Sequence, residues 1–132
     1  MAVMKQNGRR ACGELGERIA QRHLERRGYQ VLERNFRTRY GEIDLIAADP
    51  RAIVFCEVKT RVAGGAGGPD GPLDAIGRLK RRQVRLIAAQ WFSVRSDDPE
   101  RPRRPELRFD AIGVTLEADG RLVSLEHLEG AF

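Results

Sequence analysis

The fold of this chain is decided by the stretch from Gly41 to Arg61, which reads GEIDLIAADPRAIVFCEVKTR. Two runs of strand-forming residues, 41–47 and 52–61, flank the turn signal Asp49-Pro50, which predicts a hairpin. Both runs are apolar on either face, as is typical of strands at the centre of a sheet that is covered on both sides. The expected faces are Ile43, Leu45, Val54, Cys56 and Val58 on one side, and Ile46, Ile53 and Phe55 on the other.

The flanking segments predict one helix before the hairpin, and one helix and two strands after it. Helical spacing covers residues 11–27 and 73–94, and Gly28 ends the first helix. Further strands are expected at residues 29–36, 107–116 and 121–128, and a glycine-rich loop at 62–72. The order α-β-β-β-α-β-β predicts a three-layer α/β fold with a central mixed five-stranded sheet flanked by helices. The helix between the third and fourth strands implies a parallel pair.

The chain has 132 residues, which predicts a single domain. We expect that domain at residues 11–132, after a basic N-terminal tail at residues 1–10. The net charge is +5, and two basic segments, residues 1–40 and 78–104, flank an acidic centre at 41–77. Basic flanks suit a polyanionic partner such as nucleic acid, and an acidic centre suits a cation. The alternative is that these charges are solvated surface.

Several classes of protein are not expected from this sequence. The first ten residues are polar and basic, and no apolar segment follows them as in a secretion signal. The longest apolar run, residues 52–56, is too short to span a bilayer. Cys12 and Cys56 form no CxxC pair, and with His23 and His127 they show no zinc-ligand spacing. The sequence therefore predicts a cytoplasmic protein with reduced thiols and no membrane partner.

Three charged residues, Asp44, Glu57 and Lys59, interrupt the apolar central strands. Glu57 and Lys59 are two apart and point the same way, and Asp44 can lie near Glu57 if the strands pair across the turn. Glu17 falls on the face of the first helix that should meet the sheet. Buried carboxylates are costly and repel one another. A divalent cation, Mg²⁺ or Mn²⁺ in its place, removes both problems, since it binds a few oxygens and a phosphate.

A structural ion pair, Glu57–Lys59 or Asp44–Lys59, is the alternative explanation of these charges. The chain holds 21 Arg and only 3 Lys, so a lysine at this place is unusual in itself. A second lysine, Lys80, lies at the start of the apolar stripe of the second helix. Its side chain either reaches the same site or extends from the helix edge into solvent. A compact ammonium can orient a reacting water or stabilise developing charge.

At these positions the chain resembles a known superfamily. The signature D…(D/E)-x-K of the restriction-endonuclease-like, or PD-(D/E)XK, nucleases resembles the pattern of Asp44 followed, after twelve residues, by Glu57-Val58-Lys59. Ile43 stands where a proline is usual in that signature. Beyond its first ten residues the chain is similar to the YraN-like family of bacterial proteins, which in turn resembles archaeal Holliday-junction resolvases. The matching segments are Gly13-x-x-Gly16-Glu17-x-x-Ala20, Gly28-Tyr29, Arg34-Asn35, residues 41–46, Phe55-x-Glu57-Val58-Lys59-x-Arg61 and Arg108-Phe109-Asp110.

The resemblance implies a restriction-endonuclease-like fold and a metal-dependent endonuclease, with structured or branched DNA as the substrate and a homodimer as a candidate assembly. Asp44 and Glu57 would bind the Mg²⁺ or Mn²⁺ together with the Val58 carbonyl, Glu17 would assist, and Lys59 would position the water. The residues expected to hold nucleic-acid phosphates are Arg37, Arg39, Arg61, Lys80, Arg81, Arg82 and Arg85.

Other interpretations stay open from the sequence. The chain is alternatively a nucleic-acid-binding module on the same fold with weak or no catalysis, or a protein–protein adaptor whose charges are structural. The 62–72 loop is either a flap that closes over DNA or an unstructured connection. Asp110 is not assigned to the metal, and we expect it to pair with an arginine.

Overall fold

The computed structural model describes residues 6–64 and 78–132, apart from the side chains at positions 6, 7, 9, 78 and 79. Its elements, in chain order, are α1 (Gln6–Arg26), β1 (Gln30–Thr38), β2 (Gly41–Ala48), β3 (Ala52–Val62), α2 (Arg78–Ser93), β4 (Glu106–Leu116) and β5 (Leu122–Leu128). This is the predicted order of helices and strands, and it confirms the α/β class.

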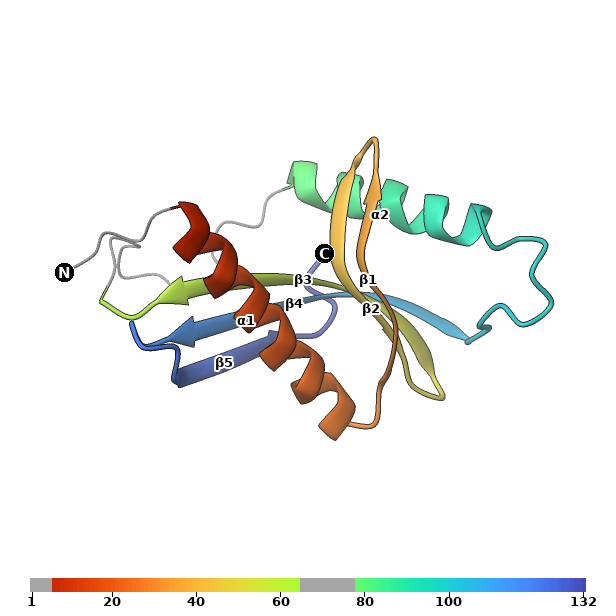
Figure 1. Cartoon of the computed structure of the whole chain (residues 1–132). Helices are drawn as coiled ribbons and strands as arrows, with labels where there is room; N and C mark the ends of the chain where they lie inside the picture. The colour runs from red at the N-terminus through yellow and green to blue at the C-terminus, as the bar shows by residue number, and fades with distance from the viewer. Residues whose placement is uncertain (1–5, 65–77) are drawn as a thin grey trace.

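The five strands form one mixed sheet in the order β1-β2-β3-β4-β5. Neighbours pair antiparallel except β3 and β4, which run in parallel from the Ala52–Glu106 pair to the Val62–Leu116 pair. The parallel pair follows from the crossover through α2 and confirms the prediction. Figure 1 shows α1 crossing one face of the sheet and α2 beside the β1–β2 hairpin.

Each helix covers its own apolar cluster, so the core lies on both faces of the sheet. Ala20 and Leu24 of α1 pack with β3 residues such as Val54. Trp91 of α2 packs against Phe55, with ring centroids 5.6 Å apart in a T-shaped arrangement. Because the central hairpin contributes to both clusters, its expected burial on two faces is confirmed.

One expectation about the faces of the hairpin is wrong. Ile43 was expected beside Leu45, but it packs with Ile46 in the cluster under α2, whereas Leu45 packs in the cluster under α1. Ile43 and Ile46 are three residues apart, so the two-residue alternation of a strand is interrupted between them. On the neighbouring strand at this point, Asn35 has a φ of 53°, a left-handed conformation that interrupts a regular strand.

The ends of two elements also differ from the prediction. α1 begins at Gln6 instead of residue 11, because residues 6–10 carry no apolar spacing that would reveal a helix. β3 continues through Val62, so the loop expected from residue 62 starts later. The rest of that loop, and positions 73–77 of the expected second helix, lie outside the described residues. Neither helix that the structure describes combines the length and apolar character needed to cross a membrane.

Candidate functional site

Asp44 lies at the point where β2 and β3 stop pairing. The paired register of the two strands ends at Leu45 and Cys56, and Asp44 is the next residue along β2. Its Oδ2 accepts a hydrogen bond of 2.7 Å from the backbone N–H of Val58. A carboxylate therefore satisfies an amide that a regular antiparallel ladder would pair with a backbone carbonyl.

The charge on Asp44 is disfavoured in the folded protein. Burial raises its pKa to about 6, in opposition to the hydrogen bond from Val58. Repulsion from Glu17, Glu57 and Glu42 raises it further. Val58, whose N–H donates to Asp44, directly follows Glu57 on β3, so Asp44 and Glu57 occupy neighbouring places on the two strands.

Glu57 is a buried carboxylate on β3 that faces two lysines. Its side chain is 9% exposed, and its Oε1 lies 2.9 Å from the Nζ of Lys80 and 3.6 Å from the Nζ of Lys59. Its Oε2 is buried and has no hydrogen-bond partner among the described residues. A buried carboxylate oxygen that lacks a partner costs free energy, so a ligand at this atom would be stabilising.

The two lysines differ in the solvent exposure of their side chains and in the side from which they approach Glu57. Lys59 is 51% exposed and shares a face of β3 with Glu57, as predicted. Lys80 is 27% exposed and comes from the opposite side, at the start of α2. The Glu57–Lys59 ion pair that was the alternative explanation is present as well, but it leaves Oε2 of Glu57 unsatisfied within the described part of the chain.

Glu17 brings a third carboxylate to this region from α1. Burial raises its pKa, and so does the charge of Glu42, whereas a hydrogen bond from the Asn35 side chain lowers it. With its amide turned so that the nitrogen faces these carboxylates, Asn35 donates to Oε1 of Glu17 at 3.1 Å and to Oε1 of Glu42 at 2.8 Å. Because both neighbours are acceptors, the amide must present its nitrogen to them.

Two hollows open beside Glu17 on the α1 side. One, of about 280 Å³, is lined by Gly13 and by the β3 residues Val58 and Lys59, among others. The second, of about 320 Å³, has Asn35 in its wall. Across residues 6–64 and 78–132, no three His, Cys, Asp or Glu side chains converge closely enough to form a metal site alone. A cation held here would therefore also need oxygens from water, the backbone or a substrate.

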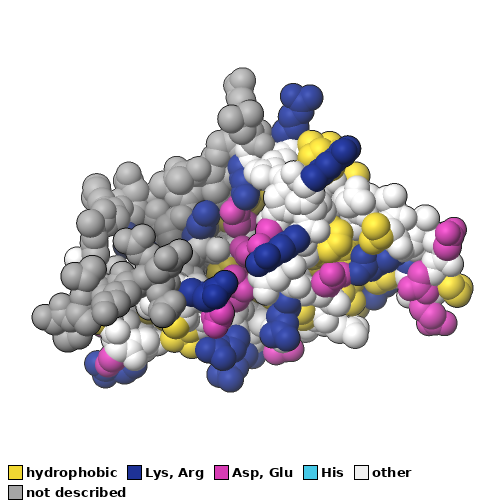
Figure 2. Space-filling view, turned by 45° about the horizontal axis from the view of Figure 1, so that its top comes forward, with side chains coloured by type: hydrophobic (Ala, Val, Ile, Leu, Met, Phe, Trp, Pro, Cys, Tyr) yellow, Lys and Arg dark blue, Asp and Glu magenta, His cyan; other side chains and the backbone are white. Residues whose placement is uncertain are grey.

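The predicted phosphate-binding arginines come from β1, the β1–β2 turn, β3 and α2. Arg37 on β1 pairs with Glu42 at 3.1 Å, and Arg39 in the β1–β2 turn lies over the Tyr40 ring at 4.9 Å. Arg81, Arg82 and Arg85 are exposed on α2, and Arg61 is partly buried near the end of β3. Figure 2 shows Lys and Arg side chains flanking a central group of Asp and Glu side chains on one face.

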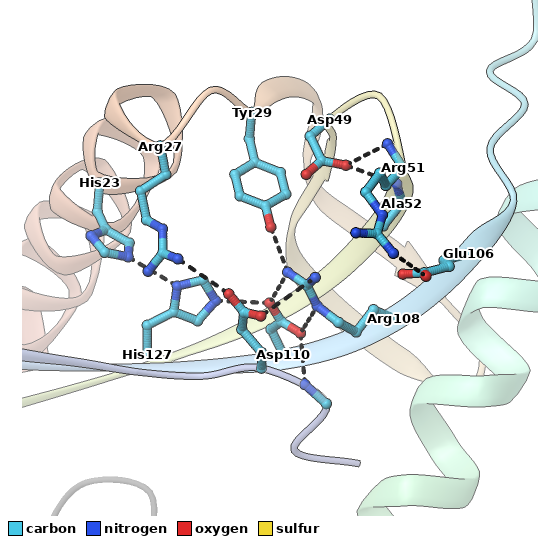
Figure 3. Close-up of polar contacts among 12 residues, drawn as sticks. His23, Arg27, Tyr29, Asp49, Arg51, Ala52, Glu106, Arg108, Asp110 and His127 are labelled. Atoms are coloured by element: carbon cyan, nitrogen blue, oxygen red, sulfur yellow. Dashed lines mark hydrogen bonds and ion pairs between the residues drawn. The ribbon is translucent and has the colours of Figure 1, made fainter.

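Asp110 belongs to a separate network on the α1 side of the sheet (Figure 3). It is fully buried and receives two hydrogen bonds from Arg108, at 2.8 and 2.9 Å, which confirms the expected pairing with an arginine. His127 and the backbone N–H of Gly130 contact the same carboxylate at 2.7 and 3.0 Å. Burial alone would raise the pKa of Asp110, but these hydrogen bonds hold it below its ordinary value.

The network continues from Asp110 to the end of α1. Arg108 donates to the Tyr29 hydroxyl at 2.6 Å, and Nε2 of His23 lies 2.9 Å from Nδ1 of His127. An ionised Asp110 only accepts, so His127 carries its proton on Nε2, and its Nδ1 accepts from His23. None of the buried side-chain nitrogens or oxygens of these described residues lacks a hydrogen-bond partner, which is typical of a structural cluster.

Most of these side chains could be recognised in the sequence, but two could not. The recognised residues, which come from the four elements α1, β2, β3 and α2, are Glu17, Asp44, Glu57, Lys59 and Lys80. Asn35, which contacts Glu17, and Glu42, which contacts Asn35, were given no role, although Arg34-Asn35 and the 41–46 segment are among the family-like motifs. The available signal was that Asn is one of the few residues other than Gly that adopt positive φ.

The fold and these side chains define a small α/β protein with carboxylates and lysines gathered where two central strands diverge. The chain belongs to the family described as uncharacterised protein family UPF0102, which matches residues 16–114 and confirms the predicted YraN-like family. A UPF0102 protein of Geobacter metallireducens is 40% identical over 123 residues, covering 93% of both chains. UPF0102 proteins of Mycobacterium sp. (strain KMS) and Parafrankia sp. are each 42% identical, over 98% and 91% of this chain and 91% and 94% of their own.

Proposed function

We propose that this protein is a metal-dependent endonuclease of the restriction-endonuclease-like superfamily that hydrolyses phosphodiester bonds of structured or branched DNA. The observation that carries the proposal is the buried Oε2 of Glu57, which has no hydrogen-bond partner among the described residues, on the strand next to an Asp44 whose pKa is raised to about 6. A cation would offset the cost of ionising Asp44 and give the buried Oε2 of Glu57 a partner, and Mg²⁺ asks for only a few protein oxygens.

The donor set suits a small divalent ion. Asp44 and Glu57 supply carboxylate oxygens, the Val58 carbonyl would supply a third oxygen, and Glu17 would contribute through a water. The proposed ion, Mg²⁺ or Mn²⁺, would polarise the scissile phosphate and lower the pKa of a bound water. The proposed ligands are all oxygens, which favours a hard cation over zinc.

The two lysines divide the remaining chemistry. Lys59 is half exposed, so its ammonium can reach a water lined up with the scissile phosphate while it stays near Glu57. Lys80 pairs with Glu57, and it would meet a phosphate oxygen if a cation took its position at that carboxylate.

The flanking arginines would hold the phosphates on either side of the scissile bond. Arg39, Arg81 and Arg82 are exposed, and Arg85 lies over the Phe109 ring at 5.3 Å. Contacts of this kind supply affinity and salt dependence without reading bases. We therefore expect a preference for DNA structure over DNA sequence, and a homodimer would allow two strands of a junction to be cleaved.

A second candidate function is a nucleic-acid-binding module with weak or no catalysis. It is favoured by the lysines that already neutralise Glu57 and by the lack of a third converging ligand among the described residues. In that case the cluster would be a charge-balanced end of the sheet, and the arginines would still bind phosphates.

Cleavage assays separate the two candidates. The protein is incubated with linear, flap, bubble and four-way-junction DNA and with structured RNA, in Mg²⁺ or Mn²⁺. We expect cleavage of a branched DNA, and we expect Glu57→Gln to reduce the rate by about a hundred-fold, roughly 2.7 kcal/mol of barrier, while DNA affinity is kept. Glu126→Gln, the same chemical change at an exposed position of β5, is the control and should cleave normally.

The result that overturns the nuclease proposal is a wild-type protein that binds DNA but cleaves none of these substrates with either ion. Equal cleavage by wild type and Glu57→Gln would also overturn it, since the activity would then come from another site or a contaminant.

A further inference from the structure

Asn35 occupies a backbone position that few residues tolerate. Its φ of 53° makes it the one residue other than glycine with positive φ in the described part of the chain. It lies opposite Asp44 on the neighbouring strand, since Arg34 pairs with Leu45 and Phe36 with Ile43. The left-handed turn of the backbone directs the Asn35 side chain toward α1, where Glu17 lies.

The amide of Asn35 joins carboxylates from two elements. Its nitrogen is a double donor, and it reaches Oε1 of Glu17 on α1 at 3.1 Å and Oε1 of Glu42 on β2 at 2.8 Å. The other oxygen of Glu42 accepts a 3.1 Å hydrogen bond from Nε of Arg37. Glu42 is thereby held by hydrogen bonds from Arg37 and Asn35. Because the same Asn35 amide also donates to Glu17, the position of Glu17 depends on that of Glu42.

The chemistry of this contact suits a cation site. A lysine or arginine in place of Asn35 would also orient Glu17, but it would cancel the negative charge that attracts a metal ion. A neutral amide orients two carboxylates and leaves their charge available. Glu17 is then held on the side of Asp44, because Asn35 contacts Glu17 and lies opposite Asp44 on the neighbouring strand.

We propose that Asn35 is a positioning residue that holds the Glu17 carboxylate toward Asp44, so that Glu17 contributes to cation binding at the Asp44–Glu57 site. This proposal rests on the proposed function, because it needs a cation at that site. It assigns Asn35 no contact with substrate and no direct contact with the cation.

The experiment measures Mn²⁺ affinity by calorimetry in three variants, with cleavage recorded in parallel. Asn35→Gly removes the amide and keeps the backbone conformation, while Asn35→Ala removes the amide and also strains it. Both should weaken Mn²⁺ binding to the same extent, by about ten-fold or more, as other supporting partners of metal ligands do. Gln21→Ala removes another amide that lines the same hollow, and it should bind Mn²⁺ like wild type.

A double-mutant cycle with Glu17→Gln tests the route of the effect. If Asn35 acts through Glu17, then Asn35→Gly should weaken Mn²⁺ binding in the wild-type background and change it no further in the Glu17→Gln background. A purely structural role would give the same loss in both backgrounds. Unaltered Mn²⁺ affinity in Asn35→Gly, or an equal loss in both backgrounds, overturns the proposal.

These outcomes can be told apart from failure of the proposed function. Wild type that binds Mn²⁺ but never cleaves overturns the nuclease and leaves the positioning role of Asn35 to be decided by the cycle. Wild type that cleaves, together with Asn35→Gly that binds Mn²⁺ normally, overturns the positioning role alone. Wild type that binds no Mn²⁺ overturns both.

Discussion

At the scale of single residues, the charge of Asp44 costs the folded protein stability. A carboxyl whose pKa is about 6 when folded, against an ordinary 3.8, binds its proton more tightly in the folded state than in the unfolded state. The folded state is therefore penalised above about pH 6, where Asp44 is ionised, and the penalty disappears as the pH falls through 6 toward 4. A bound cation would remove the same penalty at neutral pH.

Asp44→Asn should stabilise the metal-free protein at alkaline pH. The amide oxygen of the variant can still accept from the backbone N–H of Val58, and no charge is buried. We expect a gain of about 2–3 kcal/mol in unfolding free energy near pH 8 and almost none near pH 4. Urea unfolding in the presence of a chelator at both pH values measures this. A variant that is less stable than wild type near pH 8 would contradict the pKa argument.

The residues of the site differ in how readily they could be predicted from the sequence. Asp44, Glu57 and Lys59 could be predicted because charges inside buried strands are conspicuous. Lys80 could be suspected because lysine is rare in this chain. Asn35 could not, because its role depends on a local φ value that no spacing of apolar residues encodes.

At the scale of elements, the docking of α1 on β3 depends on a glycine. Gly16 is buried where the helix crosses the strand, and a Cβ added there would lie 2.9 Å from both Cβ and Cγ2 of Thr60. Such a contact is too close for two carbon atoms, so a larger residue must move the helix. Glu17 follows Gly16 directly, and this close approach therefore also sets the depth of that carboxylate.

Gly16→Ala should destabilise the protein, although alanine favours helix. We expect a net loss of about 1–2 kcal/mol, because overpacking outweighs the gain of roughly 1 kcal/mol in helix propensity. Gly13→Ala is the matched control, since a Cβ at Gly13 meets nothing within 4 Å, and it should be neutral or stabilising. Thermal unfolding of both variants, and of Gly16→Ala combined with Thr60→Ala, measures the effect. Equal melting temperatures for Gly16→Ala and Gly13→Ala would contradict the overpacking.

The predictability of the elements follows from what sequence patterns encode. The central hairpin and the parallel crossover were predictable, because apolar runs, turn residues and connection length determine them. The interrupted alternation at Ile43 was not, since period-two reasoning assumes a regular ladder. The early start of α1 at Gln6 was missed because polar helical turns carry no apolar period.

At the scale of the whole molecule, the Asp110 network ties together distant parts of the chain. It joins β4 to His127 on β5, to Gly130 beyond it, and through Arg108 to Tyr29 after α1. Since Asp110 is fully buried and held by an arginine, loss of its charge would leave several donors without an acceptor.

Asp110→Asn should lower the unfolding free energy by roughly 2–4 kcal/mol at neutral pH. The folded pKa of Asp110 lies below its ordinary value, so its contribution is present above about pH 4 and is lost as the pH falls through the folded pKa. Unfolding of the variant should therefore depend less on pH in this acidic range. Glu106→Gln, which breaks an exposed ion pair with Arg51, is the control and should change stability by less than about 1 kcal/mol. Similar losses in the two variants would contradict the assignment.

The charged groups of the site are distributed over all three layers of the fold. One central hairpin supplies Asp44 and Glu57, whereas Glu17 and Lys80 come from helices on opposite faces. A nascent chain whose strands have paired but whose helices remain undocked has only part of this constellation. Partly folded molecules therefore could not carry out any chemistry that needs all four groups. Such chemistry would begin only after both helices have docked on the sheet.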